Sequence, residues 1–191
     1  MSFIHRVFVP LFVLGMFAPA QAETVSLKLK GNPEFVSEAP LEKIVGVADG
    51  TLKMDVDFNQ LSQLKAVALI PVGSMKTGNG IRDDHLKDAE WLNAKKFPNI
   101  QFETKTVTVK KSKGDAQKGK AVLIAKGEIM IHGVKKEISP KVSIKWSPKS
   151  VQVKTKFEVA LADFGVKGAQ GVVGKKVGKT IQITTKFKVR R

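Results

Sequence analysis

The sequence predicts an all-β fold, either a closed antiparallel barrel or a sandwich, and three observations support this prediction. Apolar residues recur at every second position in several segments. Short runs containing glycine, proline or aspartate separate these segments, as is typical of turns between hairpin strands. Only one segment, residues 81–96, has the features of a helix.

Each predicted strand has one apolar face and one face rich in lysine. The apolar positions of the clearest segments are Val25, Leu27 and Leu29; Leu52, Met54, Val56 and Phe58; Val142, Ile144 and Trp146; Val151, Val153, Phe157 and Val159; and Ile181, Ile183, Phe187 and Val189. The alternation changes phase between Phe102 and Val107, which predicts a β-bulge near Thr104. The predicted turns contain Asp49-Gly50, Lys113-Gly114-Asp115, His132-Gly133, Ser147-Pro148-Lys149 and the glycine-rich segment 165–178.

The single predicted helix runs from Ile81 to Lys96. Asn79 is placed to cap its first turn, aspartates follow near its positive amino end, and Pro98 ends it. Its apolar stripe is narrow, which is expected of a lid that lies across the mouth of a barrel. Such a helix would cover an opening without being buried on all sides.

The first 22 residues are predicted to be a cleaved secretory signal peptide. Arg6 gives a basic start, residues 7–17 form an apolar run, and Ala20-Gln21-Ala22 is a small-x-small cleavage site. This apolar run is too short for a membrane-spanning helix, which needs about 20 residues. We therefore expect residues 23–191 to form one exported domain located in the periplasm.

Lysine dominates the charge of the chain. Of 33 lysines and arginines, only Arg6, Arg82, Arg190 and Arg191 are arginines, and removal of residues 1–22 lowers the formal charge from +16 to +15, since it removes Arg6 and no acid. Such a charge would draw the protein toward anionic surfaces, including phospholipid and lipopolysaccharide head groups. We expect no nucleic-acid partner, because an exported protein rarely meets one.

The chain contains no cysteine, which excludes disulfides, thiol catalysis and thiolate metal sites. His85 and His132 are the only histidines after residue 22, and neither has a short-spaced set of metal ligands around it. We therefore predict no metal and no cofactor, apart from a bound lipid or quinone. The fold must be stabilised by packing.

Three motifs resemble the YceI family of lipocalin-like bacterial proteins that bind polyisoprenoid lipids. The first is Arg82-Asp83-x-His85-Leu86, continued by Trp91-Leu92 and Lys96-Phe97-Pro98-x-Ile100-x-Phe102. The others are residues 127–136 and Asp163-Phe164-Gly165-Val166. The resemblance implies an up-and-down lipocalin-like barrel of about eight strands, with an amphiphilic isoprenoid lipid, such as a polyprenyl or quinone species, held in the apolar interior.

The predicted ligand contacts follow from this resemblance and from the apolar strand faces. The expected apolar lining consists of Met54, Phe58, Leu69, Leu86, Trp91, Phe102, Ile129, Ile131, Val142, Ile144 and Phe157. Arg82, Asp83 and His85 are the expected head-group or lid residues, because a guanidinium offers a planar fork of donors that lysine lacks. The alternative for Arg82 and Asp83 is a capped helix start with a surface ion pair.

Several alternatives stay open at this level. A barrel of eight strands can be filled by its own side chains instead of enclosing a cavity. The protein could also be a lipid-modifying enzyme that uses His85 and Asp83, or a cationic module that binds anionic envelope surfaces. We predict a binding protein, not an enzyme, with a peripheral contact to an anionic membrane as a second interaction and a homodimer as one alternative for the oligomeric state.

Overall fold

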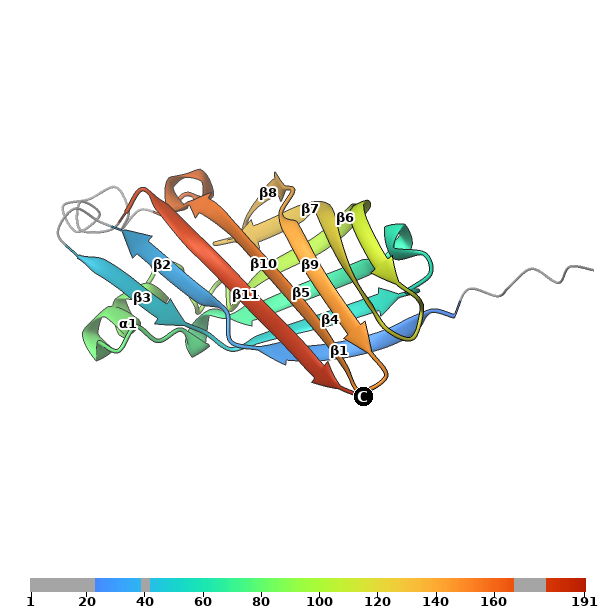
Figure 1. The fold of residues 1–191 in the computed structure, drawn as a ribbon. Helices are drawn as coiled ribbons and strands as arrows, with labels where there is room; N and C mark the ends of the chain where they lie inside the picture. Colours follow the sequence, from blue (N-terminus) through green and yellow to red (C-terminus); the bar gives the residue numbers. More distant parts are fainter. Residues whose placement is uncertain (1–22, 39–41, 167–177) are drawn as a thin grey trace, which may run out of the picture.

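The computed structural model describes residues 23–38, 42–166 and 178–191 and shows an antiparallel β-barrel (Figure 1). Eight strands close it in the order β1-β4-β5-β6-β7-β9-β10-β11, with β11 pairing back to β1. The barrel prediction is confirmed, and the sandwich alternative is wrong because all strands belong to one sheet. The strands are β1 (Val25–Gly31), β4 (Gly50–Val56), β5 (Lys65–Pro71), β6 (Asn99–Gly114), β7 (Gly119–Ile131), β9 (Lys141–Ser147), β10 (Ser150–Ala160) and β11 (Thr180–Arg190).

A two-stranded ribbon extends the barrel wall at one end. β2 (Glu34–Glu38) pairs with the start of β11, and β1 pairs with the end of β11, so that two short strands line one long strand. β3 (Lys43–Val47) pairs with β2, and the short helix α1 (Gly80–Lys87) lies near this ribbon in Figure 1. Ribbon and helix together build the mouth of the barrel.

The remaining elements are short. β8 (Val134–Ile138) pairs with β7, and three 3-10 turns connect strands, namely η1 (Leu61–Gln63), η2 (Val72–Ser74) and η3 (Leu161–Phe164). No helix within the described ranges is long and apolar enough to cross a membrane. The predicted signal peptide and most of the glycine-rich segment 165–178 lie outside the described residues.

The predicted helix is shorter than expected. Asn79 caps it as predicted, because its side-chain oxygen accepts a hydrogen bond from the Arg82 backbone N–H at 3.2 Å. The helix ends at Lys87 instead of Lys96, and turns follow. A continued helix would place the adjacent Trp91 and Leu92 about 100° apart around its axis, whereas the turns bury both side chains in the same cluster.

The predicted bulge and tight turn are confirmed. The register of β6 against β7 shifts between Thr104 and Thr106, and the Thr104 hydroxyl accepts a hydrogen bond from the Ala66 backbone N–H at 2.8 Å. His132 and Gly133 both have positive φ, 51° and 76°, which is the geometry of a two-residue hairpin turn. A second register shift, between Val109 and Lys111, has no counterpart in the sequence prediction.

The two ends of the barrel are packed differently. At the end remote from α1, the Trp146 ring stacks on Phe58 with centroids 5.0 Å apart, and its Nε1 donates a hydrogen bond to the Asp115 carbonyl at 2.7 Å. The Arg191 guanidinium lies 4.9 Å from the centroid of the Phe58 ring. We call this the closed end, because aromatic side chains fill the barrel there.

Candidate ligand cavity

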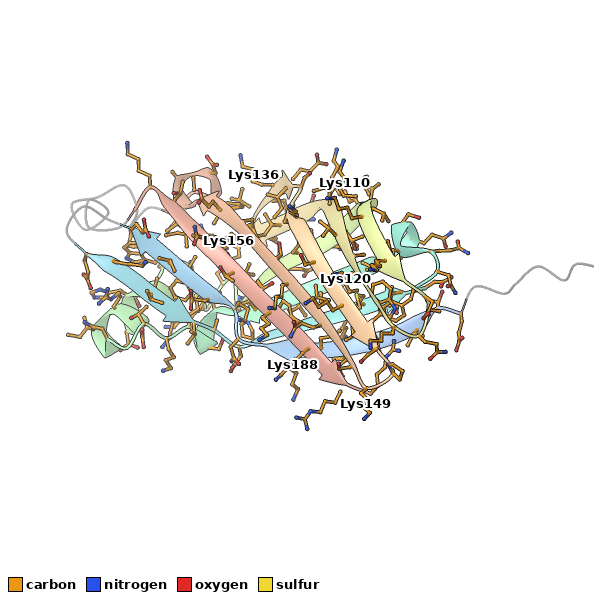
Figure 2. The ribbon with its side chains drawn as sticks, in the orientation of Figure 1. Lys110, Lys120, Lys136, Lys149, Lys156 and Lys188 are labelled. Atoms are coloured by element: carbon orange, nitrogen blue, oxygen red, sulfur yellow. The ribbon has the colours of Figure 1, made fainter. Side chains whose placement is uncertain are left out.

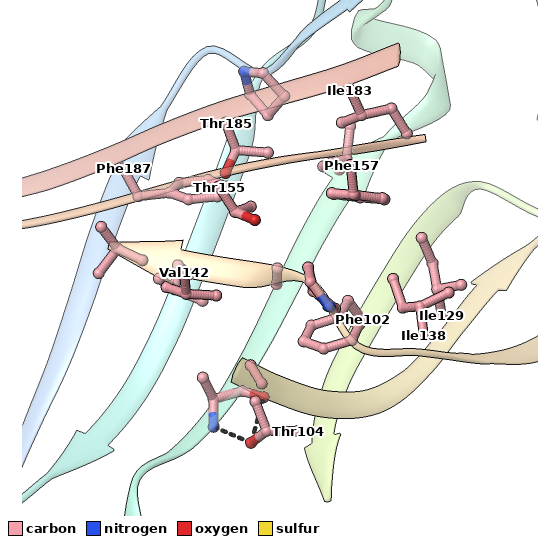
Figure 3. A pocket seen from close by; sticks show the side chains of 18 of the residues that line it. Phe102, Thr104, Ile129, Ile138, Val142, Thr155, Phe157, Ile183, Thr185 and Phe187 are labelled. Atoms are coloured by element: carbon pink, nitrogen blue, oxygen red, sulfur yellow. Dashed lines mark hydrogen bonds between the residues drawn. The ribbon is translucent and has the colours of Figure 1, made fainter. Parts of the chain in front are cut away.

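The middle of the barrel contains an apolar cavity of about 120 Å³, which we call the inner cavity. Inward side chains of all eight barrel strands except β1 form its wall, and Figure 3 shows several of them converging on it. Phe102, Phe157 and Ile183 point inward yet are only partly buried, because the cavity leaves room beside them. The alternative of a barrel filled throughout is therefore wrong for this part of the molecule.

A second cavity of about 420 Å³ lies at the mouth, and we call it the mouth cavity. Both cavities are lined by Phe35, Met75, Ile100 and Ile183, so they are adjacent compartments along one path. The larger one alone falls in the range of about 300–1,000 Å³ that is typical of small-molecule sites. The path runs from α1 toward the closed end.

Most of the predicted lining residues lie in these walls. The inner cavity includes Met54, Phe102, Ile129, Val142, Ile144 and Phe157. The mouth cavity includes Leu86, Trp91 and Ile131. Whether they contact a ligand stays a prediction.

Two predicted lining residues are misplaced. Leu69 lies between Ala68 and Ile70 on β5, and since alternate residues of a strand face opposite sides, it points out of the barrel while its neighbours line the inner cavity. Phe58 faces inward but belongs to the closed end, where it stacks on Trp146. The prediction of these two residues as cavity lining is wrong.

The predicted head-group residues separate into two groups. Arg82 and His85 line the mouth cavity, and the Arg82 Nη1 donates to the Glu42 Oε1 at 2.8 Å. This ion pair joins the start of α1 to the residue before β3. It agrees with the alternative prediction of an ion pair at the helix start, but the sequence does not predict the partner of Arg82, because the two residues are 40 positions apart.

Asp83 has a structural role instead. Its carboxylate is buried and accepts hydrogen bonds from both the backbone N–H and the hydroxyl of Thr77, each at 2.7 Å. The Thr77 hydroxyl, with smaller contributions from the Thr77 N–H and nearby lysines, lowers the pKa of Asp83 below its ordinary value of 3.8, against the opposing effect of burial. Asp83 lines neither cavity, so the head-group alternative of its prediction is wrong, and the lid alternative stays a prediction.

The inner cavity has few polar groups, and three are threonines that the sequence reasoning passed over. The Thr104 hydroxyl accepts a hydrogen bond from the Ala66 backbone N–H, and the Thr155 hydroxyl donates one to the Lys141 carbonyl at 2.8 Å. Thr185 is buried, and its hydroxyl has no hydrogen-bond partner among the described residues. The alternation of β11 could have identified it, because Thr185 falls between the inward Ile183 and Phe187.

The site offers little for catalysis or metal binding. His85 and Asp83 do not form a hydrogen-bonded pair in the described structure, where Thr77 holds the carboxylate. His132 is the other histidine of the barrel, and its Nδ1 lies 3.2 Å from the Phe164 carbonyl. Within the described residues, no group of three or more histidines, aspartates and glutamates could hold a metal ion.

The fold and the site define a lipocalin-like barrel with a deep apolar cavity. Residues 23–189 match the YceI-like domain, and the chain belongs to this family. The chain is also similar to UPF0312 proteins of Staphylococcus aureus, for example 46% identical over 59 residues to those of strains bovine RF122 and N315. These matches cover 31% of this chain and about a third, 34%, of the curated relatives' length.

Solved structures share the fold at low sequence identity. BcnA of Burkholderia cenocepacia superposes with a TM-score of 0.71 at 16% identity, covering 84% of this chain and 96% of BcnA. A polyisoprenoid binding domain from Saccharophagus degradans gives 0.66 at 13%, with the same coverages of 84% and 96%. A Campylobacter jejuni YceI protein gives 0.57 at 21%, covering 81% of this chain and 88% of that protein.

Proposed function

We propose that this protein binds an amphiphilic isoprenoid-type lipid, with the hydrocarbon tail in the inner cavity and the polar end in the mouth cavity. The observation that carries this proposal is the pair of adjacent cavities, which gives a long apolar path with one polar rim. The Saccharophagus degradans domain of the same fold, described as polyisoprenoid binding, supports the choice of ligand class.

The chemistry of the walls fits a hydrocarbon chain. Each methylene that moves from water into such a cavity gains about 0.8 kcal/mol, so a long chain would bind strongly relative to water. Relative to a membrane the gain is close to zero, because both environments are apolar. This balance suits a carrier that takes up a lipid and releases it again.

The polar end of the ligand would meet Arg82, Glu42 and His85 at the mouth. Arg82 gives one donor to Glu42 and retains further guanidinium donors for a ligand oxygen. This arrangement supports binding and orientation, and it contains no acid and base pair positioned for catalysis. We therefore propose a binding protein and not an enzyme.

The location of this carrier is part of the proposal. The signal peptide expected in residues 1–22 would export the protein to the periplasm. Cell fractionation together with the mass of the isolated protein tests this. A protein that keeps residues 1–22 and stays in the cytoplasm contradicts it.

One pair of variants tests the cavity directly. Ala68→Phe places a ring inside the inner cavity, and Leu69→Phe places one on the outer face of the same strand. Protein purified from its native host should release a stoichiometric apolar lipid on organic extraction, as identified by mass spectrometry. We expect Ala68→Phe to lose most of this lipid and Leu69→Phe to retain it, with both variants folded by circular dichroism. Equal lipid content in both variants, or no lipid in the unaltered protein, would overturn the proposal.

A further inference from the structure

The outer surface carries a row of lysines that face one another across neighbouring strands. In this row, which we call the lysine ladder, Lys113 of β6 lies opposite Lys120 of β7, and Lys120 lies opposite Lys145 of β9. The row continues through Gln152 of β10 to Lys188 of β11 and then to Lys30 of β1. Its five lysine members are Lys30, Lys113, Lys120, Lys145 and Lys188, of which Figure 2 labels Lys120 and Lys188.

This arrangement costs stability. Side chains directly opposite in an antiparallel pair have Cβ atoms about 4.5–5.5 Å apart, and like charges at that distance repel. All five lysines are exposed, and none takes part in the ion pairs of the described structure. A neighbouring pair, Lys154 opposite Lys186, adds to the repulsion.

Acidic partners are present elsewhere on the sheet, on β7 and on the neighbouring β8. Toward the mouth, Glu128 of β7 pairs with Lys135 at 2.9 Å and with Lys105 at 3.6 Å, and Glu137 pairs with Lys126 at 2.9 Å. Three lysines of this region, Lys105, Lys126 and Lys135, are therefore paired with acids, whereas no member of the ladder is paired with an acid in the described structure. Folding alone gives no reason for this difference, whereas an external anion would.

The shape of the ladder indicates which kind of anion. It crosses six strands, β6, β7, β9, β10, β11 and β1, of the eight that close the barrel. With strands about 4.8 Å apart, it extends for roughly 24 Å around a convex surface. A flat bilayer can touch only the few neighbouring members that face it at one time. A flexible chain with repeated negative charges can follow the whole row.

We propose that the lysine ladder binds a flexible linear polyanion of the acidic polysaccharide class, outside the barrel and independently of the lipid cavity. Lys145 of the ladder is adjacent in sequence to Trp146 of the closed end, and no ladder lysine is among the described residues that line the mouth cavity. The mouth with α1 therefore stays accessible when the polyanion is bound. This second site goes beyond the proposed lipid binding and does not depend on it.

Two triple variants with the same change in net charge test the proposal. The ladder variant carries Lys120→Gln, Lys145→Gln and Lys188→Gln, and the control variant carries Lys95→Gln, Lys136→Gln and Lys179→Gln at exposed positions outside the ladder. The probe is a fluorescent, size-fractionated heparin oligosaccharide, and anisotropy gives its dissociation constant over a range of salt concentrations. We expect the ladder variant to bind roughly tenfold or more weakly at low salt. The slope of log K against log salt should fall by about 2 in magnitude, at about 0.7 for each lysine replaced.

The thermal midpoint and the lipid content of the ladder variant are measured as well. The thermal midpoint of the ladder variant should be equal to or higher than that of the unaltered protein at low salt, because repulsion has been removed, so weaker binding cannot be ascribed to unfolding. Its lipid content should be unchanged. Equal weakening in both variants would overturn the proposal, since net charge alone would then explain binding. Loss of binding to phosphatidylglycerol vesicles with unchanged heparin binding would overturn it in favour of a bilayer.

Discussion

The closed end and the mouth of this barrel are built from the same alternating strands, yet they pack in different ways. At the closed end, Trp146, Phe58 and Arg191 form a stacked plug, and Trp146 donates a partly buried hydrogen bond to the Asp115 carbonyl. At the mouth, the side chains leave about 420 Å³ unfilled, and polar contacts such as Arg82 with Glu42 hold the rim. The comparison teaches that dense aromatic packing is concentrated at one end of the barrel and unfilled volume at the other.

The largest expected effect is a loss of stability, which should be greater for a substitution at the closed end than for one in the cavity wall. Trp146→Ala removes a buried ring, its stacking and its hydrogen bond, and we expect a loss of about 3–5 kcal/mol in the free energy of unfolding. Phe157→Ala removes a ring that is only partly buried beside an existing cavity, and we expect about 1–3 kcal/mol. Denaturant unfolding of the two variants measures both values. A larger loss for Phe157→Ala would mean that the cavity wall, not the plug, is the stable part.

A second prediction concerns how the mouth loop depends on pH. Because the folded-state pKa of Asp83 is lowered below 3.8, ionised Asp83 stabilises the fold. This contribution is complete above the ordinary value and is lost as the pH falls through the folded-state pKa. Asp83→Asn should therefore be less stable than the unaltered protein at neutral pH, and the difference should shrink in acid.

Thermal unfolding at a series of pH values measures this difference. Asp84→Asn is the matched control, since Asp84 is exposed and its carboxylate forms a surface ion pair with Lys87 at 3.4 Å. A stability difference for Asp83→Asn that stays constant between neutral pH and pH values well below 3.8 would show that the charge of Asp83 is not the cause.

A third prediction concerns the boundary between the two regions. Thr185→Val keeps the shape of the side chain and removes a buried hydroxyl that has no partner among the described residues. We expect the ligand-free protein to gain about 1 kcal/mol in stability, because burying an unpaired hydroxyl is costly. Thr155→Val is the control and should lose stability, since its hydroxyl donates to the Lys141 carbonyl.

The smallest effect on stability is expected for the Arg82–Glu42 ion pair at the mouth. Arg82→Ala, Arg82→Lys and Glu42→Gln should each change the free energy of unfolding by less than about 1 kcal/mol, because the ion pair is partly exposed. Lipid retention should fall in all three, with Arg82→Lys close to Arg82→Ala if the planar fork is needed. Full retention in the three variants would show that the ion pair is a surface contact only.

The sequence predicts the fold well because strands with one buried face have a strict period of two. The phase change near Thr104 and the positive φ values at His132 and Gly133 are also predictable, since each has a local cause. The helix end is predicted wrongly, because the burial of Trp91 and Leu92 depends on the barrel and not on neighbouring residues.

The site is less predictable than the fold. Alternation identifies the inward faces, but it cannot say which end of a barrel is filled, so it assigns Phe58 to the cavity although this residue belongs to the plug. The partner of Arg82 is Glu42, and no local pattern links them. The role of Asp83 depends on Thr77, whose position is fixed by the loop before α1.

If the protein carries a lipid as proposed, the plug at Trp146 and Phe58 would also determine the order in which the two ends of the ligand enter and leave. A cavity that is closed at one end has a single opening, so a lipid that enters tail first must leave head group first. The polar end of such a ligand would stay nearest the exit throughout. A receiving protein or membrane would then contact the head group first, and the lipid would not need to reorient inside the barrel.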